Sequence, residues 1–167
     1  MKNNEDLSQP RSVRDSQSEM NEIVLPNDAN PLGALLGGRL MHWMDIAAAL
    51  SAQRHCSRIC VTASVDEMSF LGPVKLGQVV HLKASVNRAF NTSMEVGVKV
   101  WVENYLHDTC EHVSSAYLTF VAIDAGGRRL PVPAVVPESD EQRRRYEDAG
   151  RRRETRRLEL ERRNLKS

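Results

Sequence analysis

Asp45 is the residue whose surroundings most need an explanation. It is the one carboxylate in a long apolar segment, residues 35–53, where most of its neighbours are methionine, tryptophan, isoleucine and alanine. Burying a carboxylate without a partner is costly or changes its protonation. A structural interpretation is an ion pair with Arg39, or a partly exposed face shared with His42. The chemical interpretation is an active site, because charges on buried elements cluster there.

The loop before this segment favours the chemical interpretation. Asn30 supplies a polar amide, and the pair Gly37 and Gly38 opens the apolar segment. The first N–H groups of a helix have no internal partner and lie at the positive end of its dipole. Glycines there allow a substrate carbonyl to approach the backbone, as oxyanion stabilisation requires. Close packing of the helix on a sheet is the alternative reason for this glycine pair.

Other reactive residue types do not form recognisable sites. Cys56 and Cys60 lie near His55, but they lack the paired spacing of a zinc site, so no metal is expected and structural thiols are predicted. No serine lies in a G-x-S-x-G elbow, and no phosphate-binding glycine motif is present. With Cys110, the cysteines number three, and an odd number argues against a disulfide framework and for a cytoplasmic protein.

The elements that must position these residues follow from hydropathy patterns. A short strand is expected at residues 22–25, and residues 35–53 form a helix that is apolar on nearly every face and therefore buried. Four strands follow, with alternating or β-branched patterns typical of an antiparallel sheet with one face on a core. They are expected at residues 60–70, 78–87, 93–103 and 112–123. The pattern predicts an α+β fold in which a curved antiparallel sheet wraps around one central helix.

Composition separates a central domain from two polar ends. Residues 1–16 are predicted to be a disordered tail, residues 17–137 a single domain, and residues 138–167 a charged extension, helical and broken near Gly150, or disordered. The extension nets +3 and could bind RNA or another anion, but its interleaved acidic residues favour a solvated helix. The whole chain has a formal charge of +1. That balance predicts no nucleic-acid partner, and no apolar run suits a signal peptide or a membrane span.

Several motifs together resemble the hot-dog-fold acyl-CoA thioesterases, in the branch of the cytosolic (brain-type) acyl-CoA hydrolases and their single-domain bacterial relatives. The resemblance covers residues 22–137 in register. It is carried by L-P-N-D-A-N-P-L-G at 25–33, L-G-G-R-L-M-H-W-M-D-I-A at 36–47, V-D-E-M-S-F-L-G-P-V at 65–74, T-S-M-E-V at 92–96 and S-S-A-Y-L-T-F-V-A at 114–122.

The resemblance implies a hot-dog fold, a dimer with a continuous sheet, and often a hexamer made of three dimers. It also implies an active site at the dimer interface, where Asn30 of one subunit and Asp45 of the other face the thioester. Two-domain members divide these roles between unlike halves, whereas this chain carries both residues. Two equivalent composite sites per dimer are therefore expected.

The implied reaction is hydrolysis of fatty acyl-CoA to a fatty acid and CoA, without a cofactor. Backbone N–H groups of Gly37 or Gly38 polarise the carbonyl, and Asp45 acts as general base or attacks directly to give a mixed anhydride. Candidate contacts for the nucleotide end of CoA are one strand-end cation and the turn that follows it: Arg88, Asn91, Thr92 and Ser93. Two alternatives are a non-catalytic acyl-CoA-sensing module and an acyl-thioester dehydratase that uses His42.

Overall fold

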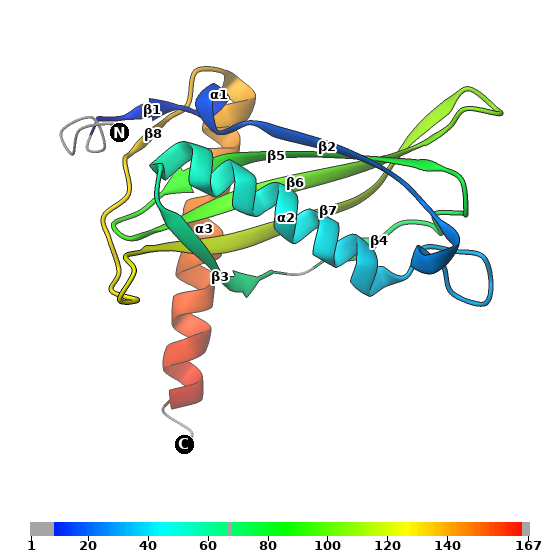
Figure 1. Cartoon of the computed structure of the whole chain (residues 1–167). Helices are drawn as coiled ribbons and strands as arrows, with labels where there is room; N and C mark the ends of the chain where they lie inside the picture. The colour runs from blue at the N-terminus through cyan, green and yellow to red at the C-terminus, as the bar shows by residue number, and fades with distance from the viewer. Residues whose placement is uncertain (1–8, 67, 165–167) are drawn as a thin grey trace.

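One curved antiparallel sheet wraps around a central helix (Figure 1). The structure is a computed structural model that describes residues 9–66 and 68–164. The strand order is β2-β5-β6-β7-β3, and β4 pairs with β7 beside this path. The elements are β2 (Ser18–Ile23), α2 (Gly37–Cys56), β3 (Ile59–Val65), β4 (Ser69–Phe70), β5 (Val79–Ala89), β6 (Ser93–Asn104) and β7 (Thr109–Ile123). The predicted α+β, hot-dog arrangement is confirmed.

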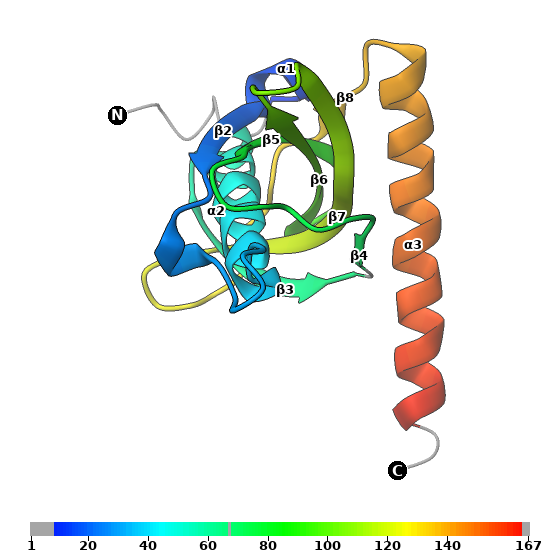
Figure 2. The same ribbon diagram turned by 90° about the vertical axis from the view of Figure 1, so that its right-hand side faces the viewer.

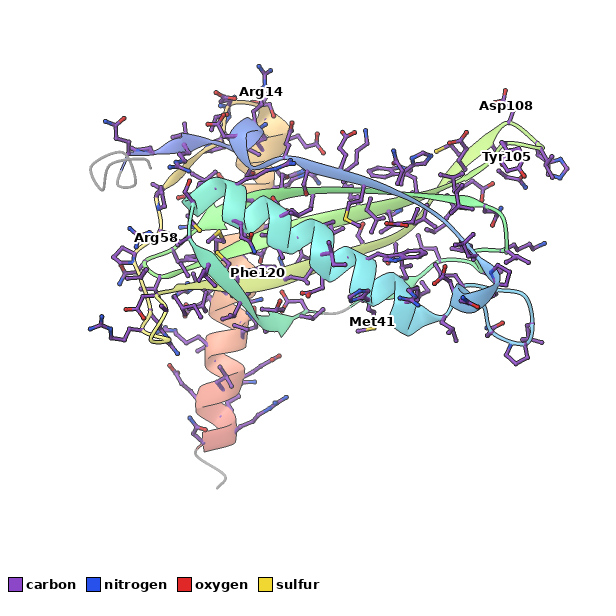
Figure 3. The ribbon with its side chains drawn as sticks, viewed as in Figure 1. Arg14, Met41, Arg58, Tyr105, Asp108 and Phe120 are labelled. Carbon is purple, nitrogen blue, oxygen red and sulfur yellow. The ribbon has the colours of Figure 1, made fainter. Side chains whose placement is uncertain are left out.

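Alternation along the strands produces the core. In β6, Met94, Val96, Val98 and Val100 are buried, and they alternate with residues of the outer sheet face. Strand residues two apart point to the same face, so these side chains form a continuous apolar surface under α2. Phe120 of β7 belongs to the same layer and lies between the sheet and the helix (Figure 3).

Helix α2 is covered on one side only. Trp43, Met44 and Ala47 are buried, whereas Met41 and Leu50 are 45% and 39% exposed. The helix is buried against the sheet as expected, but part of its apolar surface is exposed in the isolated chain. The sheet surrounds only part of the helix circumference, and the remaining part faces outward beside the edge strand β3.

The expected strand at residues 60–70 is divided into two. β3 pairs with β7 up to Val65, and β4 then pairs with an earlier part of β7, with Ser69 opposite Ser115. Between them, the Asp66 N–H donates to the Tyr117 carbonyl. The first strand also lies earlier than expected, at Ser18–Ile23, and a 3₁₀ turn η2 (Pro26–Asp28) follows it.

The N-terminal segment joins the fold earlier than predicted. β1 (Arg11–Ser12) pairs with β8 (Val135–Val136), and α1 (Val13–Ser16) follows it. Arg11 donates to the carbonyl of His55, 2.6 Å away, at the C-terminal end of α2. Val13 and Ser16 are buried. The predicted disordered tail is therefore wrong for residues 11–16, and residues 1–8 lie outside the described part of the chain.

The charged extension forms one helix, α3 (Asp140–Asn164), on the outer side of the sheet (Figure 2). The predicted break at Gly150 is absent. A side chain there would start 2.3 Å from Arg88 Nη1, so glycine allows the helix and the strand cation to pack closely. No helix in the described residues is long and apolar enough to cross a membrane.

Candidate active site

Asp45 lies on the side of α2 that faces the edge strand β3. The Thr62 hydroxyl donates to Asp45 Oδ1 at 2.6 Å, the length of a charge-assisted O–H···O⁻ bond. Asp45 is half-buried, and Thr62 is exposed. The carboxylate is therefore oriented by its neighbour and still reachable from the edge of the sheet.

The ion pair between Asp45 and Arg39, which was the structural alternative, does not form. Arg39 Nε instead lies 2.8 Å from Asp28 Oδ1. Within residues 9–66 and 68–164, no cation forms an ion pair with Asp45. His42 is exposed and makes no hydrogen bond to Asp45 in the same ranges. A carboxylate without a cation partner is available as a base or a nucleophile, whereas an ion pair would make it a weaker base.

Asn30 organises the loop that precedes α2. Its side-chain Oδ1 accepts the N–H groups of Leu32 at 2.9 Å and Ala34 at 3.2 Å. The Asn30 carbonyl accepts the N–H of Gly33, whose φ of +72° is a conformation that favours glycine. The side-chain oxygen thus closes the loop, and the Nδ2 group is the donor that remains for a ligand.

The start of α2 presents backbone donors. Its N-cap is Leu36, which provides no side-chain hydrogen bond to the helix. The N–H groups of the first helical residues, Gly37 and Gly38, have no partner within the helix. Both glycines are exposed, and a Cβ at Gly38 would meet nothing within 4 Å. An anion or a polarised carbonyl can therefore approach this helix end closely.

One chain holds the expected catalytic groups apart. Asp45 follows Gly38 by seven residues, which corresponds to about 10 Å along a helix. No hydrogen bond in the described part of the chain joins Asn30 to Asp45. The donors at the start of α2 and the carboxylate in its third turn therefore do not form a complete site within a single chain.

The expected CoA-binding residues lie at the far end of the sheet. β5 has eleven residues and spans about 36 Å at most. It begins next to the loop of Asn30 and ends at the turn of Asn91 and Thr92. Helix α2 runs between the same two ends of the sheet, and Figure 3 shows Met41 near its start and Arg58 just beyond its end.

Helix α3 covers part of the expected CoA-binding residues. The Arg88 guanidinium lies over the Tyr146 ring at 4.3 Å and over the Phe90 ring at 5.5 Å. Arg153 Nη1 donates to the Ser93 hydroxyl at 3.2 Å. Two of the predicted substrate-binding side chains therefore already contact α3, while Asn91 at the turn is exposed.

Sequence reasoning missed Thr62. The signal for it is weak, because a threonine in a β-branched strand is common. It becomes relevant only because β3 returns beside α2 and brings the Thr62 hydroxyl into contact with Asp45. In the described ranges, no group of three or more His, Cys, Asp or Glu side chains could hold a metal ion.

Comparison with known proteins identifies the family. The model of the thioesterase superfamily matches residues 32–105. The Bacillus subtilis (strain 168) protein called uncharacterized acyl-CoA thioester hydrolase YkhA is 41% identical over 132 residues, which are 79% of this chain and 77% of that protein. Two longer relatives are from Mus musculus: the chain covers 24% of acyl-coenzyme A thioesterase 11, at 40% identity, and 25% of acetyl-coenzyme A thioesterase, at 34% identity. The chain belongs to the thioesterase superfamily, in the branch of the acyl-CoA thioester hydrolases.

Solved structures agree with this assignment. An acyl-CoA hydrolase from Staphylococcus aureus, solved with butyryl-CoA, CoA and CoA disulfide, has a TM-score of 0.82 and 35% identity over 91% of this chain and 94% of its own. Variants of that enzyme with one aspartate, asparagine or threonine changed to alanine have also been solved. A hexameric acyl-CoA thioesterase has a TM-score of 0.88 and 36% identity, over 91% of this chain and 97% of that one.

Proposed function

We propose that this protein hydrolyses fatty acyl-CoA to a free fatty acid and CoA. The observation that carries the proposal is the pair of Asp45 and Thr62, 2.6 Å apart at the edge of the sheet. The loop residue Asn30 completes a set of one aspartate, one threonine and one asparagine. The same three residue types were replaced in the variants of the S. aureus hydrolase.

The backbone donors at the start of α2 and the Asp45 carboxylate have different roles in the reaction. The N–H groups of Gly37 and Gly38 stabilise negative charge on the thioester oxygen as a nucleophile adds to the carbonyl carbon. Asp45 takes a proton from the attacking water, or attacks itself to form an anhydride that water then cleaves. Collapse of the tetrahedral intermediate breaks the C–S bond and releases CoA as a thiolate. Thr62 holds the Asp45 carboxylate in position, and Asn30 orients the carbonyl or the water.

In the proposed dimer, a second subunit brings its Asn30 loop next to Asp45 of the first. β3 is the last strand of the sheet, and its Ile59, Val61 and Val65 are 58%, 43% and 45% exposed. An apolar edge of this kind suits pairing with another strand. Two-fold pairing of β3 with a second β3 reverses the partner and places its Asn30 loop toward Asp45. Three such dimers form the proposed hexamer, and the similar hexameric thioesterase supports this number.

The same two-fold arrangement brings the turn between β5 and β6, which follows Arg88, next to the proposed site. The partner's β5–β6 turn then lies at the end of the dimer where the first subunit's α2 begins. We assign Asn91, Thr92 and Ser93, with Arg88 behind them, to the nucleotide end of CoA. We place the reaction in the cytoplasm, where CoA esters and reduced cysteines coexist.

Release of thiol from a panel of acyl-CoA chain lengths tests the activity, with a thiol reagent as the detector. The exposed Cys110 adds a constant background that a sample without substrate removes. Hydrolysis above the rate of heated protein supports the proposal. Acyl-CoA binding without hydrolysis, measured by calorimetry, would instead identify a sensing module.

Mixing two inactive variants tests the composite site. Asn30→Ala and Asp45→Asn each remove one half, and a heterodimer of the two contains one site with both residues intact. Subunit exchange is therefore expected to restore activity toward half of the wild-type rate per heterodimer. If mass spectrometry detects heterodimers and activity does not recover, the two residues act within one subunit.

A further inference from the structure

Cys56 and Cys60 form a close pair of thiols that the proposed reaction does not use. Cys56 is the last residue of α2, and Cys60 is the second residue of β3. Their sulfur atoms lie 3.1 Å apart, within hydrogen-bonding distance. Between them the chain reverses at Ser57, which adopts the left-handed conformation with φ 53°. A helix end, a tight turn and a strand start thus hold two thiols against each other.

The contact makes the two thiols chemically unequal. The hydrogen bond from Cys60 lowers the pKa of Cys56 to about 7, although burial acts in the opposite direction. The same interaction, with burial, raises the pKa of Cys60. At neutral pH, Cys56 is therefore partly a thiolate, which is the nucleophilic form, and Cys60 remains a thiol beside it.

We propose that Cys56 and Cys60 are an oxidation site that a hydroperoxide converts to an intramolecular disulfide. The Cys56 thiolate attacks one oxygen of hydrogen peroxide, the O–O bond breaks, and the products are a sulfenic acid and hydroxide. The Cys60 sulfur then attacks the Cys56 sulfur and displaces the hydroxyl group as water. In sum, two thiols and one hydrogen peroxide give one disulfide and two waters, and the peroxide is reduced.

The pair lies beneath a surface turn, which is the route proposed for a small oxidant. Cys56 is fully buried and Cys60 is 9% exposed, but the turn between them is at the surface. Ser57 is exposed, and it lies outside β3, the strand that the proposed dimer covers. The third cysteine, Cys110, is exposed on β7. It therefore reacts separately and serves as an internal comparison.

The disulfide also affects the proposed catalytic pair, a consequence that rests on the proposed function. Cys60 and Thr62 are two residues apart in β3 and point to the same face, toward α2. A covalent bond draws the two sulfur atoms about 1 Å closer than they are in the thiol form. The movement acts on the strand that holds Thr62 against Asp45, so oxidation is expected to slow hydrolysis.

Peptide mapping tests the site without any assay of activity. In a Cys110→Ser background, hydrogen peroxide is added, remaining thiols are blocked, and the protein is digested with trypsin. Cleavage after Arg54, Arg58 and Lys75 separates Cys56 from Cys60, so the two peptides stay together only through a disulfide. We expect a linked pair that dithiothreitol separates, and an intact mass lower by two hydrogen atoms. Separate peptides with both thiols blocked after peroxide would overturn the proposal.

Single variants check the order of the steps. Cys60→Ser leaves Cys56 without its resolving partner, so a sulfenic acid that dimedone traps is expected at Cys56. Cys56→Ser is expected to react several times more slowly at Cys60, because the remaining thiol has no lowered pKa. Faster trapping in Cys56→Ser than in Cys60→Ser would contradict the assigned roles.

Activity is measured last, on protein whose linked fraction is known. In the Cys110→Ser background, the rate is expected to fall about tenfold on oxidation and to return with dithiothreitol, since a misplacement of 1 Å can cost as much as about 10²-fold. Cys56→Ser is expected to keep its rate under peroxide. A fully linked enzyme with an unchanged rate would overturn the coupling to Asp45, whereas absence of hydrolysis in the reduced protein would overturn the proposed function.

Discussion

The two faces of the sheet are covered by helices of opposite character. On the inner face, α2 packs through apolar side chains such as Trp43, Met44 and Ala47. On the outer face, α3 contacts the sheet through arginines, and its one buried residue in the described range is Ala149 (Figure 2). The Arg152 guanidinium pairs with Glu95 at 2.6 Å and lies 3.6 Å from the centre of the Tyr117 ring.

A second ion pair connects α3 to the segment after β3. Arg156 Nη1 contacts both carboxylate oxygens of Asp66, at 2.7 and 2.6 Å. Most candidate catalytic groups belong to the inner helix and the loop before it, and the charged helix contains none of them. The comparison therefore suggests that α2 carries the chemistry, while α3 stabilises the sheet from outside. The following changes test this division.

Asp45→Asn should have the largest effect on the inner face. It preserves the size of the side chain but removes the base or nucleophile, so the hydrolysis rate should fall about 10²-fold or more. The fold should survive, because loss of a half-buried charge is often neutral for stability. Steady-state kinetics and thermal unfolding of the same preparation measure both effects. A variant that unfolds at a much lower temperature would show that Asp45 is structural.

Arg152→Gln should have the largest effect on the outer face. It leaves the Glu95 carboxylate, which is fully buried, with Asn87 as the one side-chain partner among the described residues. Removing one member of a buried pair costs about 3 kcal/mol of unfolding free energy. Urea unfolding measures the loss, and kcat of the folded fraction should stay within about twofold.

Arg157→Gln is the matched control for the outer face. Arg157 lies on the same helix, and its ion pairs within residues 9–66 and 68–164 are with Glu154 and Glu161; all three side chains are exposed. An exposed pair contributes about 0.2–1 kcal/mol, so the unfolding free energy should change little. Equal losses in Arg152→Gln and Arg157→Gln would mean that the helix itself, rather than the Glu95 contact, determines stability.

Thr62→Val should have a smaller effect on the rate than Asp45→Asn. Valine keeps the branched shape but removes the hydroxyl that donates to Asp45. A hydrogen bond to a charged group contributes about 1.5–3 kcal/mol. Because Thr62 is exposed, the lower end of that range applies, which corresponds to a fall in kcat of about tenfold. Thr62→Ser retains the donor and should recover most of the rate. Equal activity of the valine and serine variants would exclude a role for the hydroxyl.

Lowering the pH should slightly reduce the stability of the folded protein, through His55 at the end of α2. Burial lowers the pKa of His55, whose Nε2 contacts the Pro133 carbonyl at 2.9 Å. The unfolded chain then binds more protons, so the stability from neutral His55 is present above about pH 6.5 and decreases as pH falls below it. Melting temperatures between pH 8 and pH 5 should fall more in wild type than in His55→Gln. Parallel curves would assign the decrease to other groups.

Local patterns predicted the parts of the fold that depend on near neighbours. Strand alternation placed β6 at residues 93–103, against Ser93–Asn104 observed, and the apolar run placed α2 within a few residues of its ends. The position of Asp45 in that helix was readable for the same reason. Helical and strand periodicities are properties of consecutive residues, so they are present in the sequence before any tertiary contact forms.

Contacts between distant residues were decided by the tertiary structure. Thr62 meets Asp45 because β3 returns beside α2, and Arg152 meets Glu95 across 57 residues of chain. Gly150 lies within α3 beside Arg88, which fills the space that a side chain would need. The N-terminal segment joins the fold through contacts with distant residues, among them Arg11 with the end of α2 and β1 with β8. The residues in each of these pairs are far apart in the sequence. Only the packing of the sheet on its two helices brings them into contact.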